Sequence, residues 1–157
     1  MKTSGRFAVA VHLLTLVALA CDEAEGECLA SERMAESVGT NPVVVRRILG
    51  FLREAGLVES HSGPGGGWRL ARPPEAMTLL DVYRALGEEP VLATRQAPPH
   101  PCCPVGPRMR GVLAPIFRKA EAALERELAA VTVGEVLEAV LAAGGPRHDR
   151  PPDFTVL

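Results

Sequence analysis

Two short helices joined by a tight turn constrain this fold more than any other feature of the sequence. The first is expected over Ser31–Val38, with Ser31 as its N-cap and Gly39 closing its end. The second is expected over Pro42–Ala55, where Asn41 is the N-cap and proline occupies the one helical position that favours it. Two such short helices with a two-residue turn predict a helix-turn-helix.

The second of these helices has two distinct faces. Side chains that repeat at three and four residues must enter the core, and these are Val45, Ile48, Leu49 and Leu52. The opposite face and the preceding turn hold Thr40, Asn41, Val43, Arg46, Arg47 and Gly50. Because an arginine fork binds guanine or phosphate and a helix fits the major groove, this face is a candidate DNA-reading surface. Gly50 costs about 1 kcal/mol relative to alanine in mid-helix, which indicates a close approach of its backbone either to DNA or to another helix.

A hairpin with a glycine-rich tip is expected next. Its strands are Leu57–Ser60 and Trp68–Leu70, with Trp68 plugging the core beneath them. Bare glycine amides approach phosphates without obstruction, so the tip suits the DNA backbone or the minor groove. The residues expected at DNA are His61, Gly63, Gly65, Gly66 and Arg69. A nucleotide-binding loop is disfavoured, because the tip lacks the Gly-Lys-Ser/Thr ending and a following helix.

The fold class expected is mainly α with a small β-hairpin wing, a winged helix-turn-helix followed by a long C-terminal dimerisation helix. The apolar run Phe7–Ala20 predicts a largely buried first helix, and Thr78 caps a helix that reaches Leu86. The expected organisation is a DNA-binding domain over 1–86, a proline-rich linker over 87–107, dimerisation helices over 108–145 and a disordered tail over 146–157.

The long helix is expected over Arg108–Ala130, starting or kinking at Pro115. Its apolar stripe is longer than one small winged domain can cover, which predicts a two-fold homodimer. The stripe consists of Met109, Leu113, Ile116, Ala120, Leu124 and Leu128. Thr132 and Glu135 predict a capping box for a last helix that ends near Gly144.

Composition and charge fit a small helical DNA-binding protein. Aromatic residues make up 4% of the chain and apolar residues 47%, so leucine, valine and alanine must form the core. The formal net charge is -2, but residues 40–72 hold five arginines against two glutamates, a local positive patch. The N-terminal apolar run resembles a secretory signal, yet His12 and Thr15 interrupt it. We therefore expect a cytoplasmic protein without a membrane span.

The four cysteines do not form a disulfide framework, because Cys21 and Cys28 are isolated and no Cys-x-x-Cys pair occurs. The side chains of adjacent Cys102 and Cys103 diverge and do not readily share a tetrahedral site with His100, so no metal or iron–sulfur cofactor is expected. Cys103 precedes an expected helix start, where free amides favour thiolate. Two interpretations stay open: Cys103 and Cys102 form a regulatory thiol site, or they only pack the helix entry.

The chain resembles the Rrf-type (Rrf-two) family of bacterial transcription regulators, which includes IscR, NsrR and CymR. The resemblance spans roughly residues 1–140 and rests on Thr40–Arg47, Leu52–Val58 and, most specifically, the run GPGGGWRLARP at Gly63–Pro73. It implies a winged helix-turn-helix, a C-terminal dimerisation helix and operator binding that usually represses. It also implies that Arg46 and Arg47 approach bases while the glycine run forms the wing.

The chain departs from the best-known members at two places. Cluster-binding members carry three spaced cysteines before the dimerisation helix, whereas only an adjacent pair occurs here, within Pro101–Gly106. The chain looks more like the YwnA-type branch, which shows a Cys-Pro-Val/Ile-Gly motif at this place. Ser62 stands where an arginine often precedes the wing glycine, which removes one phosphate contact that the family implies.

The expected function is that of a homodimeric repressor that binds double-stranded DNA at a palindromic operator, with no catalytic activity. The sequence suggests no nucleophile, base and orienting partner together. The alternative is a winged-helix module that binds protein without reading DNA. Arg46 and Arg47 favour DNA, because a protein-binding face is more often apolar.

Overall fold

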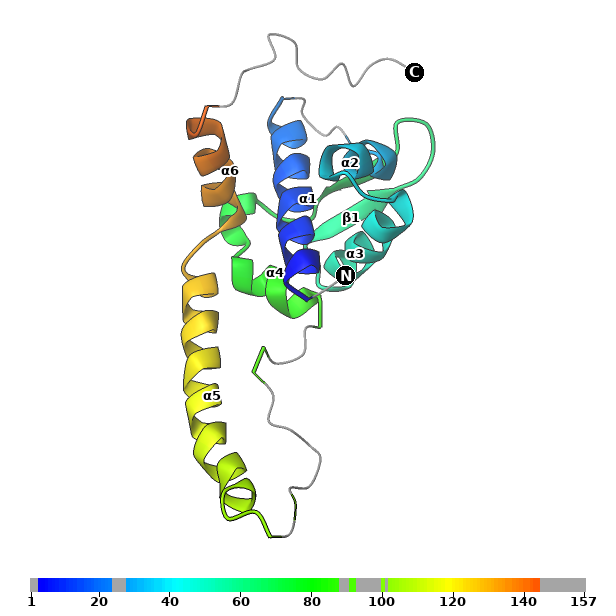
Figure 1. The fold of residues 1–157 in the computed structure, drawn as a ribbon. Helices are drawn as coiled ribbons and strands as arrows, with labels where there is room; N and C mark the ends of the chain where they lie inside the picture. The colour runs from blue at the N-terminus through cyan, green and yellow to red at the C-terminus, as the bar shows by residue number, and fades with distance from the viewer. Residues whose placement is uncertain (1–2, 24–27, 88–90, 93–99, 101, 145–157) are drawn as a thin grey trace.

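The computed structural model describes residues 3–23, 28–87, 91–92, 100 and 102–144. Six α-helices, one short 3-10 helix and a two-stranded antiparallel sheet occupy these residues (Figure 1). In chain order they are α1 (Thr3–Glu23), α2 (Ser31–Val38), α3 (Pro42–Glu54), β1 (Val58–His61), β2 (Gly67–Leu70), η1 (Pro74–Ala76), α4 (Leu79–Ala85), α5 (Gly106–Ala129) and α6 (Val133–Ala142). The expected mainly α fold with a hairpin wing is confirmed.

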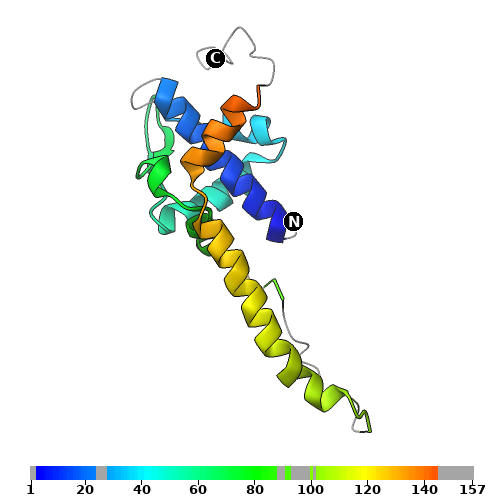
Figure 2. The same ribbon diagram turned by 90° about the vertical axis from the view of Figure 1, so that its left-hand side faces the viewer.

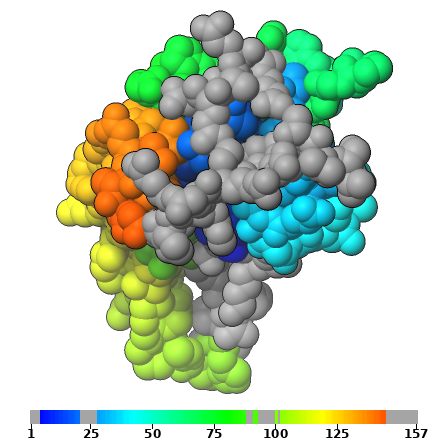
Figure 3. Space-filling view, turned by 90° about the horizontal axis from the view of Figure 1, so that it is seen from above, coloured from blue at the N-terminus to red at the C-terminus, as the bar shows by residue number. Residues whose placement is uncertain are grey.

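Helix α1 is the centre of the core. It packs against α2, α3, α4, α6 and β2, so apolar side chains are needed nearly all round it. Leu13, Leu14 and Val17 are completely buried, and burial of such side chains stabilises the fold by about 1.5–3 kcal/mol each. Seen from above, α6 lies on one side of the molecule and α2 on the other (Figure 3).

The hairpin is joined to the core through Trp68. The strands pair in the register Glu59 with Arg69 and Ser60 with Trp68. The amides and carbonyls of Leu29 and Trp68 bond each other at 2.9 and 3.0 Å, which ties the hairpin to the segment before α2. The Trp68 ring is half-buried against the core, and the Arg53 guanidinium carbon lies 6.0 Å from its centroid. The predicted role of Trp68 as a core plug is confirmed.

Helices α5 and α6 follow the winged domain, and the segment that joins them is hydrogen-bonded to it. Val133 N–H donates to Met77 O at 2.8 Å, and Leu79 N–H donates to Val131 O at 2.9 Å. The predicted capping box is present, with the Glu135 N–H donating to Thr132 Oγ1 at 3.1 Å. From this segment α5 projects away from the body while α6 lies against α1 (Figures 1 and 2).

Two local predictions were wrong. Ala30, not Ser31, is the N-cap of α2, because Ser31 is the first residue of the helix and its hydroxyl interacts with Glu32 and Arg46 instead. The start predicted at Pro115 is wrong, because α5 runs through Pro115 from Gly106, where proline in the first turn already favours a start; a kink at Pro115 stays a prediction. The predicted tail over 146–157 and most of the predicted linker lie outside the described residues.

Candidate nucleic-acid interface

The turn between α2 and α3 fixes how the two helices cross. Gly39 takes a left-handed conformation with φ 68°, and the next amide, of Thr40, donates to Ala35 O at 3.0 Å. The Asn41 side chain accepts a hydrogen bond from Val43 N–H at 2.8 Å, so the predicted N-cap is confirmed. Thr40 is half-buried and Asn41 is exposed at the start of α3, on the side of the candidate reading surface.

Helix α3 buries one face and exposes the other, as its spacing predicts. Val45, Ile48, Leu49 and Leu52 are buried. Val43, Arg46 and Arg47 are exposed, and Gly50 is half-buried beside them. A Cβ built on Gly50 meets no atom within 4 Å, so no described helix of this chain explains the glycine. Of the two interpretations of Gly50, close packing against another helix of the same chain is wrong.

Arg46 is held by an acidic residue of α2. Its Nη1 lies 2.7 Å from Glu32 Oε1 and 3.3 Å from the Ser31 hydroxyl. A hydrogen bond from its own backbone amide, and then those from Ser31 and Arg46, lower the pKa of Glu32 below its ordinary value. Both partners are about half exposed, and such a pair contributes little to stability. The pair orients Arg46, and an anionic ligand can displace Glu32 at small cost.

Arg47 has no ion pair or hydrogen bond within the part of the chain that the structure describes. Its neighbour Arg46 is already engaged with Glu32. Arg47 is therefore the cation of this face that is available to a ligand without breaking any internal contact.

Arg69 and His61 of the hairpin converge on one carboxylate. Arg69 Nε donates a short hydrogen bond to Glu59, its cross-strand neighbour, and His61 Nε2 lies 3.6 Å from the same oxygen. Arg69 first, and then His61, lower the pKa of Glu59 below its ordinary value. Sequence reasoning missed both Glu32 and Glu59, because each meets its arginine only after two separate elements pack or pair.

The backbone geometry of the tip requires glycine at several of its positions. Gly63 and Gly65 have φ angles of 99° and 73°, which side-chain-bearing residues rarely adopt. A Cβ on Gly66 would lie 2.4 Å from His61 O, and the Gly66 amide donates to Gly63 O at 2.9 Å. The Gly66 amide is thus already used inside the tip, and the exposed backbone at Gly63 and Gly65 is what the tip presents outward.

Cys103 lies at the entry to α5. Its Sγ accepts a hydrogen bond from Gly106 N–H at 3.2 Å. The amide of Gly106, and then that of Val105, lower the pKa of the Cys103 thiol below its ordinary value. Cys102 is exposed, and its amide donates to His100 Nδ1 at 3.3 Å. Cys28 is half-buried, and none of these three cysteines forms a disulfide.

The described residues do not offer a metal or cluster site. No group of three or more His, Cys, Asp or Glu side chains comes together among them. Cys103 Sγ faces the backbone amide of Gly106, while Cys102 is its immediate neighbour along the chain. This donor set does not fit an iron–sulfur cluster, which needs several converging thiolates. Of the helices that the structure describes, none has the length and apolar character that crossing a membrane requires.

The apolar stripe of α5 is largely uncovered. No residue of α5 is buried, and Met109 and Ile116 are 43% and 54% exposed. Leu113, Leu124 and Leu128 are half-buried and Ala120 is exposed. Val112, which belongs to the same apolar stripe, is 58% exposed.

A family model and curated relatives match most of this chain. A family model described as "Rrf2: Iron-dependent Transcriptional regulator" matches residues 3–139. The chain is 37% identical over 134 residues to the "Putative HTH-type transcriptional regulator YwnA" of Bacillus subtilis, covering 85% of this chain and 96% of that protein. It is 34% identical over 89 residues to the HTH-type transcriptional regulator IscR of Cereibacter sphaeroides, covering 56% of this chain and 55% of that protein.

Solved structures share the fold. One, titled "Crystal structure of a putative DNA binding protein", has a TM-score of 0.65 and 37% identity, covering 84% of this chain and 98% of that one. T. potens IscR has a TM-score of 0.68 at 23% identity and covers 92% of both chains. The second likeness concerns the fold alone.

Proposed function

The chain belongs to the Rrf2 family of transcriptional regulators, and we propose that it acts as a homodimeric repressor at a palindromic DNA operator. One observation carries the proposal. Among the residues that the structure describes, Arg47 has no ion pair or hydrogen bond, and it lies beside Arg46 on the exposed face of a helix whose opposite face is buried in the core. A rigid helix that presents an unpaired guanidinium group, with a second one held by an exposed ion pair beside it, suits the acceptor edge of guanine in the major groove.

In this proposal α3 enters the major groove and the wing lies on the backbone beside it. Arg46 exchanges Glu32 for a base or phosphate, while Arg47 reaches the DNA directly. Arg69 and His61 offer N–H donors from the hairpin, and Gly63 and Gly65 let phosphates come close to the tip. The DNA-facing side of α3 and the turn before it also present Val43, Thr40, Asn41 and Gly50. The Gly66 amide bonds within the tip and does not contact DNA.

The dimer places two copies of α3, each with its hairpin wing, on one face of the DNA. The uncovered apolar stripe of α5 is what supports self-association, because methionine, valine and isoleucine side chains exposed along one helix favour burial against a partner surface. A two-fold axis then matches a palindromic site with half-sites about one helical turn apart. The same role implies a cytoplasmic protein that acts by binding rather than by catalysis.

Cys103 is the proposed signal input. Its thiol is favoured as thiolate by the amide of Gly106, at the joint between the winged domain and α5. An electron-poor alkene reacts there without any further oxidant: the sulfur forms a bond to one alkene carbon, and the other carbon takes a proton from water. The added group then displaces the Gly106 amide and alters the angle between the α3 helices of the two copies.

The direct test compares three proteins on a DNA site selected from a random library. Arg47→Ala should weaken binding by about 1–3 kcal/mol, as expected when a guanine contact is lost. Arg118→Ala removes an exposed arginine of α5, away from α3 and the hairpin, and is the matched control that should bind like the parent. Fluorescence anisotropy at two salt concentrations separates this effect from loss of general charge. Equal affinity of all three proteins for the site would remove Arg47 from the reading surface, whereas a library from which no site can be selected would favour the protein-binding alternative.

A further inference from the structure

Three charged or titratable side chains share one face of the hairpin. Glu59 and His61 are two residues apart on β1, and Arg69 pairs with Glu59 across the strands. Because successive side chains of a strand point to opposite faces, these three lie on the face opposite Ser60 and Trp68. Their side chains are between 41% and 45% exposed, so a ligand in solution can reach all three.

The carboxylate of this cluster is already engaged by the arginine. Arg69 Nε donates a short hydrogen bond to Glu59 Oε1, whereas His61 Nε2 lies 3.6 Å from the same oxygen, beyond a full hydrogen bond. Arg69, and less strongly His61, lower the pKa of Glu59, so this group stays a carboxylate near neutral pH. The three side chains together therefore carry no net charge when the imidazole is neutral and one positive charge when it is protonated.

The other titratable groups near the hairpin come from α3 and from the segment before α2. Helix α3 packs against β1 and carries Arg53 and Glu54 in its last turn, both exposed. The Arg53 guanidinium lies over the Trp68 ring, which is on the other face of the hairpin. The segment before α2, which bonds to β2 at Trp68, carries the half-buried Cys28. Within the part of the chain that the structure describes, none of these three groups forms an ion pair with His61.

The imidazole lies where the hairpin meets its glycine tip. The cross-strand neighbour of His61 is Gly67, so no side chain of β2 covers the ring from that position. Gly63 and Gly65 follow it in the tip and are exposed. Figure 1 shows the tip at the edge of the molecule beside α2, on the side away from α6. A phosphate that approaches the tip, as the proposed function requires, therefore comes close to the imidazole.

We propose that His61 takes up a proton from solvent when the wing binds a DNA phosphate, so that affinity for the operator rises as the pH falls. Histidine side chains ordinarily change charge between pH 5 and 8, and a neighbouring phosphate favours the charged form. That form donates from both ring nitrogens, so Nε2 stays beside Glu59 while Nδ1 donates to the phosphate.

The direction of the pH effect follows from linkage. A group that binds its proton more tightly in the complex adds affinity that is complete at low pH. This affinity is lost as the pH rises through the titration of the bound form. The inference rests on the proposed DNA binding and adds a sensitivity to pH at the wing.

Fluorescence anisotropy of the full chain on its selected DNA site, at constant ionic strength, tests the proposal. Because each copy takes up at most one proton, the Kd of the parent should rise roughly tenfold between about pH 6 and pH 8. His61→Gln removes the titrating charge, and its Kd should change by less than about twofold over the same range. His61→Lys keeps a permanent positive charge and should bind at pH 8 about as tightly as the parent binds at pH 6.

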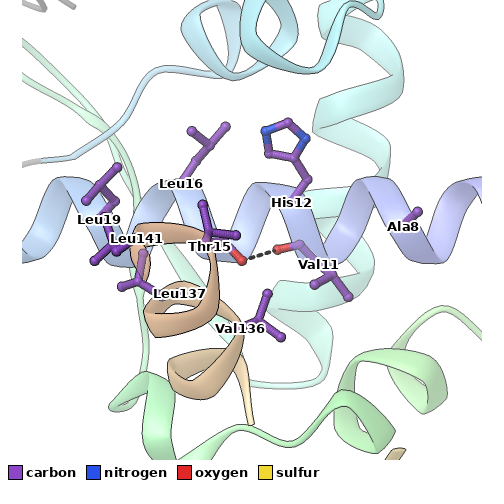
Figure 4. A pocket seen from close by; sticks show the side chains of 10 residues that line it. Ala8, Val11, His12, Thr15, Leu16, Leu19, Val136, Leu137 and Leu141 are labelled. Carbon is purple, nitrogen blue, oxygen red and sulfur yellow. Dashed lines mark hydrogen bonds between the residues drawn. The ribbon is translucent and has the colours of Figure 1, made fainter. Parts of the chain in front are cut away.

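His12→Gln is the matched control. His12 is an exposed histidine of α1 whose Nε2 lies 3.5 Å from the Ser37 hydroxyl, a contact that glutamine can keep. It lines an apolar groove between α1 and α6 rather than the hairpin (Figure 4). This variant should keep the affinity of the parent and its full dependence on pH.

The dependence on salt gives a readout that a purely structural role of His61 would not move. A protonated imidazole on a phosphate releases a counterion, so the slope of log Kd against log salt should be steeper at pH 6 than at pH 8 by up to about 0.9 per copy. The slope of His61→Gln should be the same at both pH values.

Three results overturn the inference while leaving DNA binding intact. The first is a parent Kd that does not change with pH, and the second is a pH dependence that survives in His61→Gln. The third is a His61→Lys protein that binds at pH 8 as weakly as His61→Gln. A parent that selects no DNA site at any pH would instead remove the proposed function, and this inference with it.

Discussion

The substitution Gly50→Ala is expected to change the stability of the fold and the affinity for DNA in opposite directions. Gly50 lies in the middle of α3, and a Cβ built there meets nothing within 4 Å among the described residues. Alanine therefore stabilises the helix by about 0.5–1 kcal/mol. For a chain of this size the gain corresponds to a rise in Tm of roughly 1–4 °C.

The same substitution should weaken DNA binding. The proposal places the exposed side of α3 in the major groove, where a new methyl group occupies space that the DNA fills. Overpacking of this kind costs about 1–3 kcal/mol, which is roughly a 5- to 150-fold increase in Kd. The expected result is thus a more stable protein that binds its site less tightly.

Circular dichroism melts at one protein concentration give the Tm, and anisotropy on the selected DNA site at fixed salt gives the Kd. Gly111→Ala is the matched control, because Gly111 is a helical glycine in equally open space on α5. It should be stabilised similarly and bind DNA like the parent. A Gly50→Ala protein with a higher Tm and an unchanged Kd would refute the placement of this glycine at the DNA, and a lower Tm would refute the structural premise.

Three further substitutions follow from the same geometry. Glu32→Gln removes the competitor for Arg46 and one negative charge near the DNA, so anisotropy should show a several-fold lower Kd; weaker binding would mean that Glu32 orients Arg46 for its contact. Gly66→Ala forces a Cβ to within 2.4 Å of His61 O and should speed hydrogen exchange of the tip amides, whereas unchanged protection would contradict the tip geometry. Cys103, whose pKa is lowered by the Gly106 amide, stays thiolate to lower pH than an ordinary cysteine. Mass spectrometry should therefore show maleimide labelling of Cys103 at a pH where Cys102 is still unreacted, with a loss of DNA binding that Cys103→Ser prevents; binding that survives complete labelling would leave Cys103 a structural residue.

The elements that sequence reasoning predicted well are those with local signals. The N-caps at Asn41 and Thr78 and the capping box at Thr132 are set by residues three positions apart or fewer, and each is present. The buried face of α3 follows from helical periodicity alone. Ser31 shows the limit of such signals, because a favourable capping residue was drawn into the helix by contacts with Glu32 and Arg46.

The features that were missed depend on packing between distant segments. Glu32 and Arg46 are 14 residues apart and meet only because α2 and α3 cross at this angle. Glu59 reaches Arg69 through the strand register. The α1–α6 groove joins the two ends of the chain, and no local pattern indicates that α6 returns to α1.

Selection of binding sites from random double-stranded DNA tests the central proposal most directly. The parent protein is incubated with the library, bound DNA is separated from free DNA, and the bound DNA is sequenced. The protein should enrich a palindrome whose half-sites are centred about 10 base pairs or a multiple apart. Arg47→Ala should lose preference at the same one or two positions of each half-site while keeping the spacing. A library that stays random after several rounds, or an enriched site without two-fold symmetry, would contradict a homodimer that reads DNA through α3.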